Sequence, residues 1–68
     1  MTVAAQVKQT LASLKGVRAT LDSFTSLEKA DETRKLLITS SQKLDDIIRK
    51  MEQRVAELEF QEPQYKGL

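Results

Sequence analysis

A chain of 68 residues is long enough for one small domain and no more. It contains no Cys and no His, which excludes disulfides, thiolate metal sites and a histidine general base. Its formal net charge of +1 and its few aromatic residues argue against nucleic-acid binding. No apolar run reaches the roughly 20 residues that cross a bilayer, and Gln6, Lys8 and Gln9 interrupt the hydrophobic pattern of a signal peptide. We therefore expect a soluble intracellular protein stabilised by regular helix packing and self-association.

The first predicted element is a helix over about residues 3–27. Apolar side chains recur along it in steps of four and three, the spacing of one helix face. The residues of this stripe are Val3, Val7, Thr10, Leu14, Val17, Leu21 and Phe24, and Ala4 and Leu11 widen it. Gly16 lies in its middle, at a cost of about 1 kcal/mol relative to Ala. We expect either the close approach of a neighbouring backbone at Gly16 or simple tolerance.

A break in the apolar pattern predicts a turn near residues 27–31. Continued in phase, the first stripe would place Glu28, Asp31 and Lys35 in the core. The next apolar stripe begins one residue out of phase, at Leu37. One continuous helix would therefore carry a charged gap at its centre, so we favour a helical hairpin over that alternative. Asp31 is the expected N-cap of the second helix.

The second predicted helix covers about residues 32–61 and carries the clearest heptad pattern of the chain. Its apolar core positions are Leu37, Leu44, Ile48, Met51, Val55 and Leu58, with Ser41 in the one polar slot. Three repeats without Gly or Pro are typical of coiled-coil packing against another helix. Leu36 and Ile47 widen the stripe on one flank. A catalytic serine would need a base, and the chain has no His to supply one. At Ser41 we therefore expect a small hydroxyl that bonds to its own helix or allows close packing.

Charge is distributed unevenly along the chain. Residues 1–21 carry three cations and no acid: Lys8, Lys15 and Arg18. A chain folded back at about residue 30 sets Lys8 opposite Glu52, and it sets the other two cations opposite Asp45 and Asp46. Two further pairs at a spacing of four, Asp45 with Arg49 and Asp46 with Lys50, support the second helix locally. The simpler alternative is that these charged side chains only face the solvent and form no pairs between the helices.

The last residues, 63–68, form a tail after the second helix. Pro63 ends that helix because the residue before a proline avoids the helical region. The tail holds the only Tyr of the chain, and an exposed aromatic side chain is a common anchor at protein interfaces. The predicted partner-binding residues are Pro63, Gln64, Tyr65 and Lys66. The alternative is a frayed end that only stops the helix.

Two stretches carry a family resemblance: residues 2–16 (TVAAQVKQTLASLKG) and residues 62–67 (EPQYKG). Both resemble domain-of-unknown-function family 1657, small proteins of endospore-forming bacteria that have about this length. The resemblance implies a helical protein linked to sporulation, whose genes lie beside those for spore membrane proteins. It implies no enzymatic activity and no cofactor.

These observations predict an all-α fold, an antiparallel helical hairpin over residues 1–62 that dimerises into a four-helix bundle. We expect no catalytic, cofactor-binding or metal-binding residues. The expected self-association residues are Leu36, Leu37, Leu44, Ile47, Ile48, Met51, Val55 and Leu58. Of these, the heptad core should face the Val3–Phe24 stripe of the same chain, and Leu36 and Ile47 should meet the second chain.

The predicted function is that of a non-enzymatic structural or adaptor protein that acts through protein–protein interaction. The expected partners are a second copy and a protein such as a spore membrane protein, in the cytoplasm of the forespore or in the spore. The alternative is a peripheral protein that binds an anionic membrane surface through Lys8, Lys15 and Arg18. Membrane contact is the less favoured of the two, because three cations are few for that task.

Overall fold

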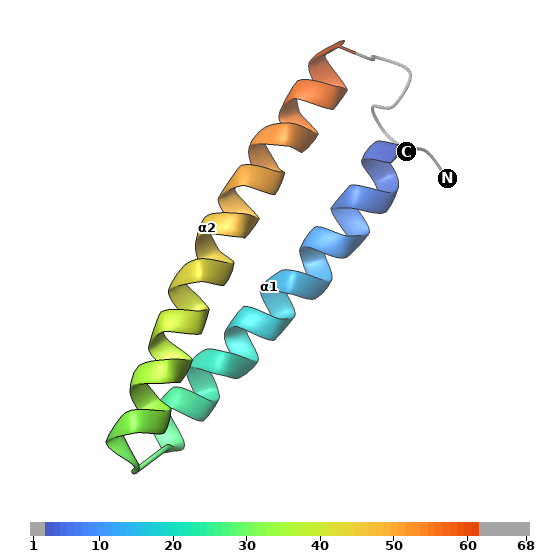
Figure 1. Ribbon diagram of the computed structural model, residues 1–68. Helices are drawn as coiled ribbons and strands as arrows, with labels where there is room; N and C mark the ends of the chain where they lie inside the picture. The colour runs from blue at the N-terminus through green and yellow to red at the C-terminus, as the bar shows by residue number, and fades with distance from the viewer. Residues whose placement is uncertain (1–2, 62–68) are drawn as a thin grey trace.

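The computed structural model describes residues 3–61. These residues form two α-helices, α1 (Val3–Leu27) and α2 (Asp31–Gln61), joined by a turn at residues 28–30. The helices run side by side in opposite directions (Figure 1). The all-helical prediction is confirmed, and the described part of the chain is a helical hairpin whose turn lies where the break in the apolar pattern placed it.

The carboxylate of Glu28 holds the turn. Its Oε1 atom accepts hydrogen bonds from the backbone N–H groups of Lys29 and Ala30, each at 3.0 Å. The Ala30 carbonyl accepts the first bond of α2, from the Arg34 N–H at 2.9 Å, so Ala30 stands at the N-cap. Asp31 is the first helical residue, where its charge favours the helix dipole and pairs with the Arg34 guanidinium at 2.8 Å. The N-cap prediction at Asp31 was therefore wrong by one residue.

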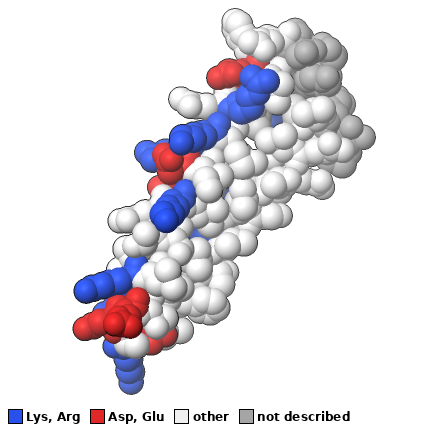
Figure 2. All heavy atoms as spheres, viewed as in Figure 1, with Lys and Arg blue, Asp and Glu red and all other residues white. Residues whose placement is uncertain are grey.

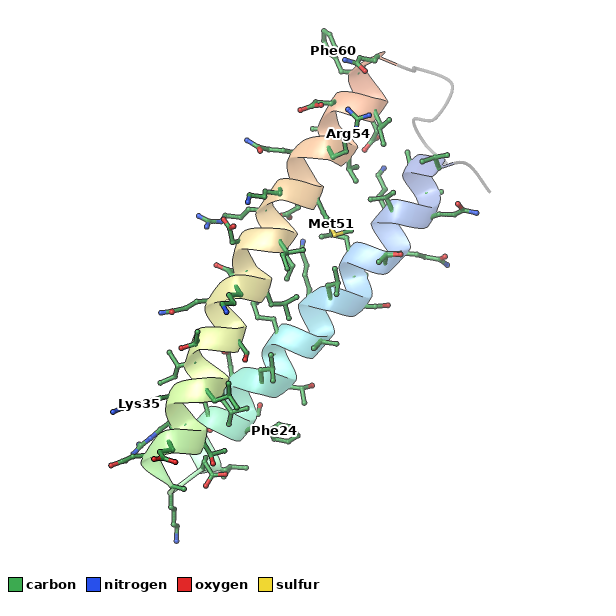
Figure 3. All side chains as sticks on the ribbon, viewed as in Figure 1. Phe24, Lys35, Met51, Arg54 and Phe60 are labelled. Carbon is green, nitrogen blue, oxygen red and sulfur yellow. The ribbon has the colours of Figure 1, made fainter. Side chains whose placement is uncertain are left out.

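The α2 side of the interface is the heptad core that the sequence predicted. Ile48 and Val55 are buried, and the other members of this core are half-buried. The α2 seam comprises Leu37, Ser41, Leu44, Ile48, Met51, Val55 and Leu58. Figure 3 shows the Met51 side chain reaching into the space between the two helices. The seam therefore packs first against α1 of its own chain, as expected.

The α1 side of the interface differs from the prediction by one residue in phase. The buried or half-buried line along α1, here called the α1 seam, comprises Ala4, Val7, Leu11, Leu14, Arg18, Leu21, Thr25 and Glu28 (Glu28 directly after the helix end). Val3, Thr10, Val17 and Phe24, which the stripe placed in the interface, are exposed. Expecting these four residues to face α2 was wrong.

The predicted stripe and the observed seam of α1 share three residues, and this overlap explains the error. Val7, Leu14 and Leu21 belong to both lines, so the remaining positions decide which phase is adopted. The adopted phase buries Leu11 and turns the cations on the flank of α1 toward the acids of α2. It also places a charged residue, Arg18, in the seam, where an ion pair with Asp45 at 2.6 Å compensates its partial burial.

The fully buried part of the interface lies away from the turn. The buried residues of the described chain are Ala4, Leu11, Ile48 and Val55, and all four belong to the half of the hairpin that is open. Near the turn, the seams carry the polar residues Arg18, Thr25, Glu28 and Ser41 beside the half-buried Leu21, Leu37 and Leu44. Apolar burial is therefore most complete in the open half, and the half next to the turn adds polar contacts to partly buried leucines.

Gly16 faces open space, so the close-approach reading does not hold. Outside its own helix backbone, no atom lies within 4 Å of the place that a Cβ at Gly16 would fill. Since nothing would clash and the position is inside a helix, we predict that Gly16→Ala raises the free energy of unfolding by about 1 kcal/mol. Urea unfolding followed by circular dichroism measures this change. An unchanged or lower midpoint would contradict it.

Candidate interaction surface

The hairpin has two unlike faces, and the seams define them. Each step along a helix turns the side-chain direction by about 100°, so the residues directly before and directly after a seam residue lie on opposite flanks. In an antiparallel pair, the "before" flanks of both helices share one face and the "after" flanks share the other. Val17 precedes Arg18 and Ile47 precedes Ile48, whereas Lys15 follows Leu14. The two faces are therefore lined by different residues from both helices.

The first face, here called the ion-pair face, joins the helices by charge. Three pairs cross it: Lys8 with Glu59 at 2.9 Å, Lys15 with Glu52 at 2.9 Å, and Arg18 with Asp45 at 2.6 Å. The acids recur at a spacing of seven residues, so each follows the α2 seam by the same rotation. Each pair is partly exposed and contributes at most about 1 kcal/mol to stability, but together they fix the register of the two helices.

The ion-pair face is hollowed near the turn. A shallow groove there is lined by Arg18, Asp22, Thr25, Ser26, Ile38, Ser41, Gln42 and Asp45. Within it the Ser41 hydroxyl donates a hydrogen bond of 2.7 Å to Asp22 Oδ1, a contact between the helices. Ser41 therefore bridges to α1. Of the two roles expected for Ser41, a hydrogen bond within its own helix is therefore not the one observed, and close packing is the role that is left. Hydroxyls that bond within their helix are found on α1, as at Thr25 with the Leu21 carbonyl.

The predicted charge pairing was right in direction and wrong in register at two places. Arg18 pairs with Asp45 as expected. Lys8 and Lys15, however, each pair with an acid one heptad further toward the open end, at Glu59 and Glu52. The reason is that side chains lean toward the N-terminus of their own helix, so a cation of α1 reaches toward the open end and an acid of α2 reaches back toward the turn to meet it. Asp45 pairs with Arg18 of the other helix, and Arg49 pairs with Asp46. The predicted pairing of Asp45 with Arg49 was therefore wrong.

Charge reversal tests this register directly. Lys15→Glu or Glu52→Lys alone should lower the free energy of unfolding by about 0–1 kcal/mol, because each brings like charges together. The double variant restores an opposite pair and should recover most of that loss. A double-mutant cycle from urea unfolding gives the coupling free energy. A matched cycle of Lys15 with Asp45, the partner expected from sequence, should give none, and the reverse outcome would exclude the observed register.

The outer surface of α2 carries a separate charge cluster around Asp46. The hydrogen bond from Lys50, at 3.1 Å, is the main cause that lowers the Asp46 pKa below its ordinary value of 3.8, and Arg49 adds to it from 3.1 Å. The Asp46–Lys50 pair is the one that the sequence predicted. Since the folded-state pKa is the lower one, its stabilising contribution is present above pH 3.8 and is lost as the pH falls through the lowered pKa.

We predict that an NMR titration of the side-chain carboxyl group finds the Asp46 pKa below 3.8. In Lys50→Gln it should move back toward that value, because the main cause is removed. Lys35→Gln, a charge change at the other end of α2, is the matched control and should leave it in place. An Asp46 pKa that ignores Lys50→Gln would show that the pair does not form in solution.

The second face, here called the apolar face, carries exposed apolar side chains from both helices, and on its α2 flank these lie among the charged residues Lys43, Lys50, Arg54 and Glu57. Its members are Val3, Val17 and Phe24 from α1 and Leu36 and Ile47 from α2, all exposed. Val3, Val17 and Phe24 lie at multiples of seven residues, so they follow one straight line beside the α1 seam. Figure 2 shows this face, with few charged atoms over α1 and with Lys, Arg, Asp and Glu gathered along α2. Phe24 projects from α1 away from α2 (Figure 3).

The structure separates the predicted self-association residues into two groups. Leu37, Leu44, Ile48, Met51, Val55 and Leu58 face α1, whereas Leu36 and Ile47 are exposed on the apolar face. The sequence missed the α1 half of this face, because Val3, Val17 and Phe24 were assigned to the interface with α2. Their spacing of seven was the available signal. The predicted tail residues, Pro63, Gln64, Tyr65 and Lys66, lie outside the described residues.

Two further properties concern the described part of the chain. Between residues 3 and 61, no three or more Asp or Glu side chains cluster in a way that could hold a metal ion. Neither α1 nor α2 has a stretch long and apolar enough to pass through a lipid bilayer.

Comparison with known proteins identifies the family. No curated protein and no solved structure matches the chain. The family model described as "Protein of unknown function (DUF1657)" matches residues 7–55, which include most of both helices and the turn between them. This match covers more than half of the sequence, and so the chain belongs to the DUF1657 family.

Proposed function

We propose that this protein is a non-enzymatic helical adaptor that acts through protein–protein interaction. In this proposal the hairpin forms a homodimer, a four-helix bundle, and a protein partner binds the assembled bundle or the tail at Pro63, Gln64, Tyr65 and Lys66. The observation that carries the proposal is the apolar face. Apolar side chains that are exposed together on one face of two neighbouring helices are typical of surfaces that bind protein.

The biological setting of the proposal comes from the family resemblance. The family that residues 2–16 and 62–67 resemble is one we associate with endospore-forming bacteria, and this resemblance supports our proposal of action in the forespore or spore. A spore membrane protein is the partner class that this setting favours. The tail is included because an aromatic side chain beside a proline offers a compact anchor for such a partner.

The alternative, binding to an anionic membrane surface, is weakened by the ion-pair face. It relied on Lys8, Lys15 and Arg18, and each of these cations is paired with an acid of α2. A surface on which each cation lies within about 3 Å of a carboxylate attracts anionic lipid weakly. We expect the protein to stay in the unbound fraction when floated with anionic liposomes. If the protein instead floated with those liposomes and added salt released it, the result would support binding to an anionic membrane surface.

A capture experiment in sporulating cells tests the adaptor proposal. The tagged full-length chain should enrich a specific protein, and that protein, once purified, should bind the chain with a measurable Kd. A variant lacking residues 63–68 should lose this binding while its circular dichroism spectrum keeps the helical signal, because the tail follows the described helices. Failure of any enriched protein to bind in purified form would contradict the proposal.

A further inference from the structure

We infer that the apolar face is the docking site of an acidic amphipathic helix that belongs to a partner protein. This helix lies along the join of α1 and α2 and completes a three-helix layer pair. Its apolar side chains meet Val17 and Ile47, and its carboxylates meet the cations of the α2 flank. The inference rests on the proposed adaptor function and names the surface and the chemistry of the partner.

The α1 half of the face carries no charge. The residues that directly precede the α1 seam residues are all exposed, and none of them is Lys, Arg, Asp or Glu. The hydroxyls of Thr10, Ser13 and Thr20 donate hydrogen bonds to carbonyls of their own helix, at 3.1, 3.3 and 3.0 Å. Since these donors are already used and Phe24 and Leu27 are exposed, this half suits apolar side chains of a partner.

The α2 half of the face carries a positive net charge. Lys43, Lys50 and Arg54 each precede a residue of the α2 seam and are exposed. Glu57 is the one acid of this flank, and it is already paired with Arg54 at 3.0 Å. Lys50 shares its acid, Asp46, with a second cation, and Lys43 has no ion pair within residues 3–61. With three cations and one acid, the flank has a net charge of +2.

These two halves select the occupant by charge. A second copy of the chain would bring the same positive charge against this flank, which weakens that contact and lets the partner displace it. Nucleic acid or an anionic membrane would meet cations on the α2 half only. A helix that presents apolar and acidic side chains on one side complements both halves at once.

The arrangement of the face fits a single helix. Two helices that pack side by side form one layer, and a third helix laid over their join covers flank residues of both. From Val3 to Phe24 the α1 line spans about 30 Å, the length of a helix of ~20 residues. Phe24 lies near the turn and Arg54 near the open end (Figure 3). The partner helix therefore places its most apolar end at the turn and its acidic end at the open end.

Site-specific photocrosslinking in the producing cells tests the inference. A benzophenone amino acid takes the place of Val17 or Ile47 in the full-length chain, and Ala19, on the ion-pair side of α1, is the matched control. After irradiation, mass spectrometry identifies the peptide joined to the chain. We expect Val17 and Ile47 to capture one segment of another protein, with a net negative charge and apolar residues at helical spacing. The Ala19 position should not capture it.

The charge requirement is measured with the purified partner. Lys43→Glu should weaken its binding about 10-fold and reduce the sensitivity of binding to salt, because it reverses an unpaired cation of the flank. Lys35→Glu makes the same change on the side of α2 that faces away from α1 (Figure 3), and it should leave the Kd within about 2-fold. Equal effects of the two variants would overturn the inference.

The crosslinking outcomes separate this inference from the adaptor proposal. Crosslinks from Val17 and Ile47 only to a second copy, to lipid or nucleic acid, or to a segment without net negative charge would overturn the inference, as would their absence. A purified partner that binds with a measurable Kd but is not captured at Val17 or Ile47 would leave the adaptor proposal standing and remove this inference.

Discussion

Truncation of one side chain, Ile48→Ala, is expected to destabilise the hairpin more than any other truncation to alanine, by about 2–5 kcal/mol. Ile48 is 1% exposed and is the largest fully buried side chain of the described residues. Only three other residues between 3 and 61 are buried, so the packing lost around it has little else to replace it. At about 0.05–0.15 kcal/mol per residue, a chain of 68 residues has about 3–10 kcal/mol of stability, so this loss should remove a large share of it.

Ile38→Ala is the control for this prediction, since it makes the same chemical change on the same helix. Ile38 is 41% exposed, and its truncation should cost well under 1.5 kcal/mol because part of the side chain already contacts water. Both variants are compared with wild type by urea unfolding at one protein concentration, because association would otherwise shift the midpoint. Equal losses at Ile48 and Ile38 would mean that α2 does not present the observed seam to α1.

A lysine at Leu11 should be the most disruptive single charge on α1, and a lysine at Thr10 should be tolerated. Leu11 is 8% exposed in the interface, whereas Thr10 is exposed on the flank. Leu11→Lys removes an apolar side chain and places an ammonium group against α2, which we expect to cost more than about 3 kcal/mol. Thr10→Lys exchanges one exposed polar side chain for another and should change the stability of the unassociated hairpin, measured at low protein concentration, by about 0.5 kcal/mol or less.

Thermal unfolding of these two variants separates the two phases of α1. The sequence stripe has Thr10 on its central line and Leu11 only at its edge, so in that phase Thr10→Lys would be at least as destabilising as Leu11→Lys. A helical signal retained by Leu11→Lys and lost by Thr10→Lys would contradict the structure and restore the sequence prediction. Because the substitutions are adjacent and introduce the same side chain, differences in helix propensity or net charge do not explain a large gap between them.

The buried line of α2 could be predicted from the sequence because every other line of positions on this helix contains charged residues. Between Leu37 and Leu58, only one line of positions is apolar throughout apart from Ser41, and shifting it by one residue would bury charges such as Asp45 and Glu52. The turn was predicted for a related reason, since charged residues fill the positions that a continuous helix would bury. In both places a wrong assignment would desolvate several charges, and this cost leaves one solution.

On α1 the sequence left two solutions, and local reasoning chose the wrong one. Val17 and Phe24 are large and apolar, and they outweigh Ala4 and Thr25 in any count of hydrophobic residues. The choice depends on α2, because the ion pairs of Lys8 and Lys15 form in one phase only. The same long-range dependence made the apolar face hard to predict, since it consists of the residues that the interface with α2 leaves exposed.

An isotope-filtered NOE experiment on the labelled chain, mixed with its purified and unlabelled partner, tests the central claim most directly. This measurement detects only contacts between chains, within about the distance of packed side chains. We predict intermolecular NOEs at the methyl groups of Val17 and Ile47, and none at the methyl group of Ala19. The absence of intermolecular NOEs at Val17 and Ile47, or contacts between chains only on the side of Ala19, would contradict binding of the partner through the apolar face.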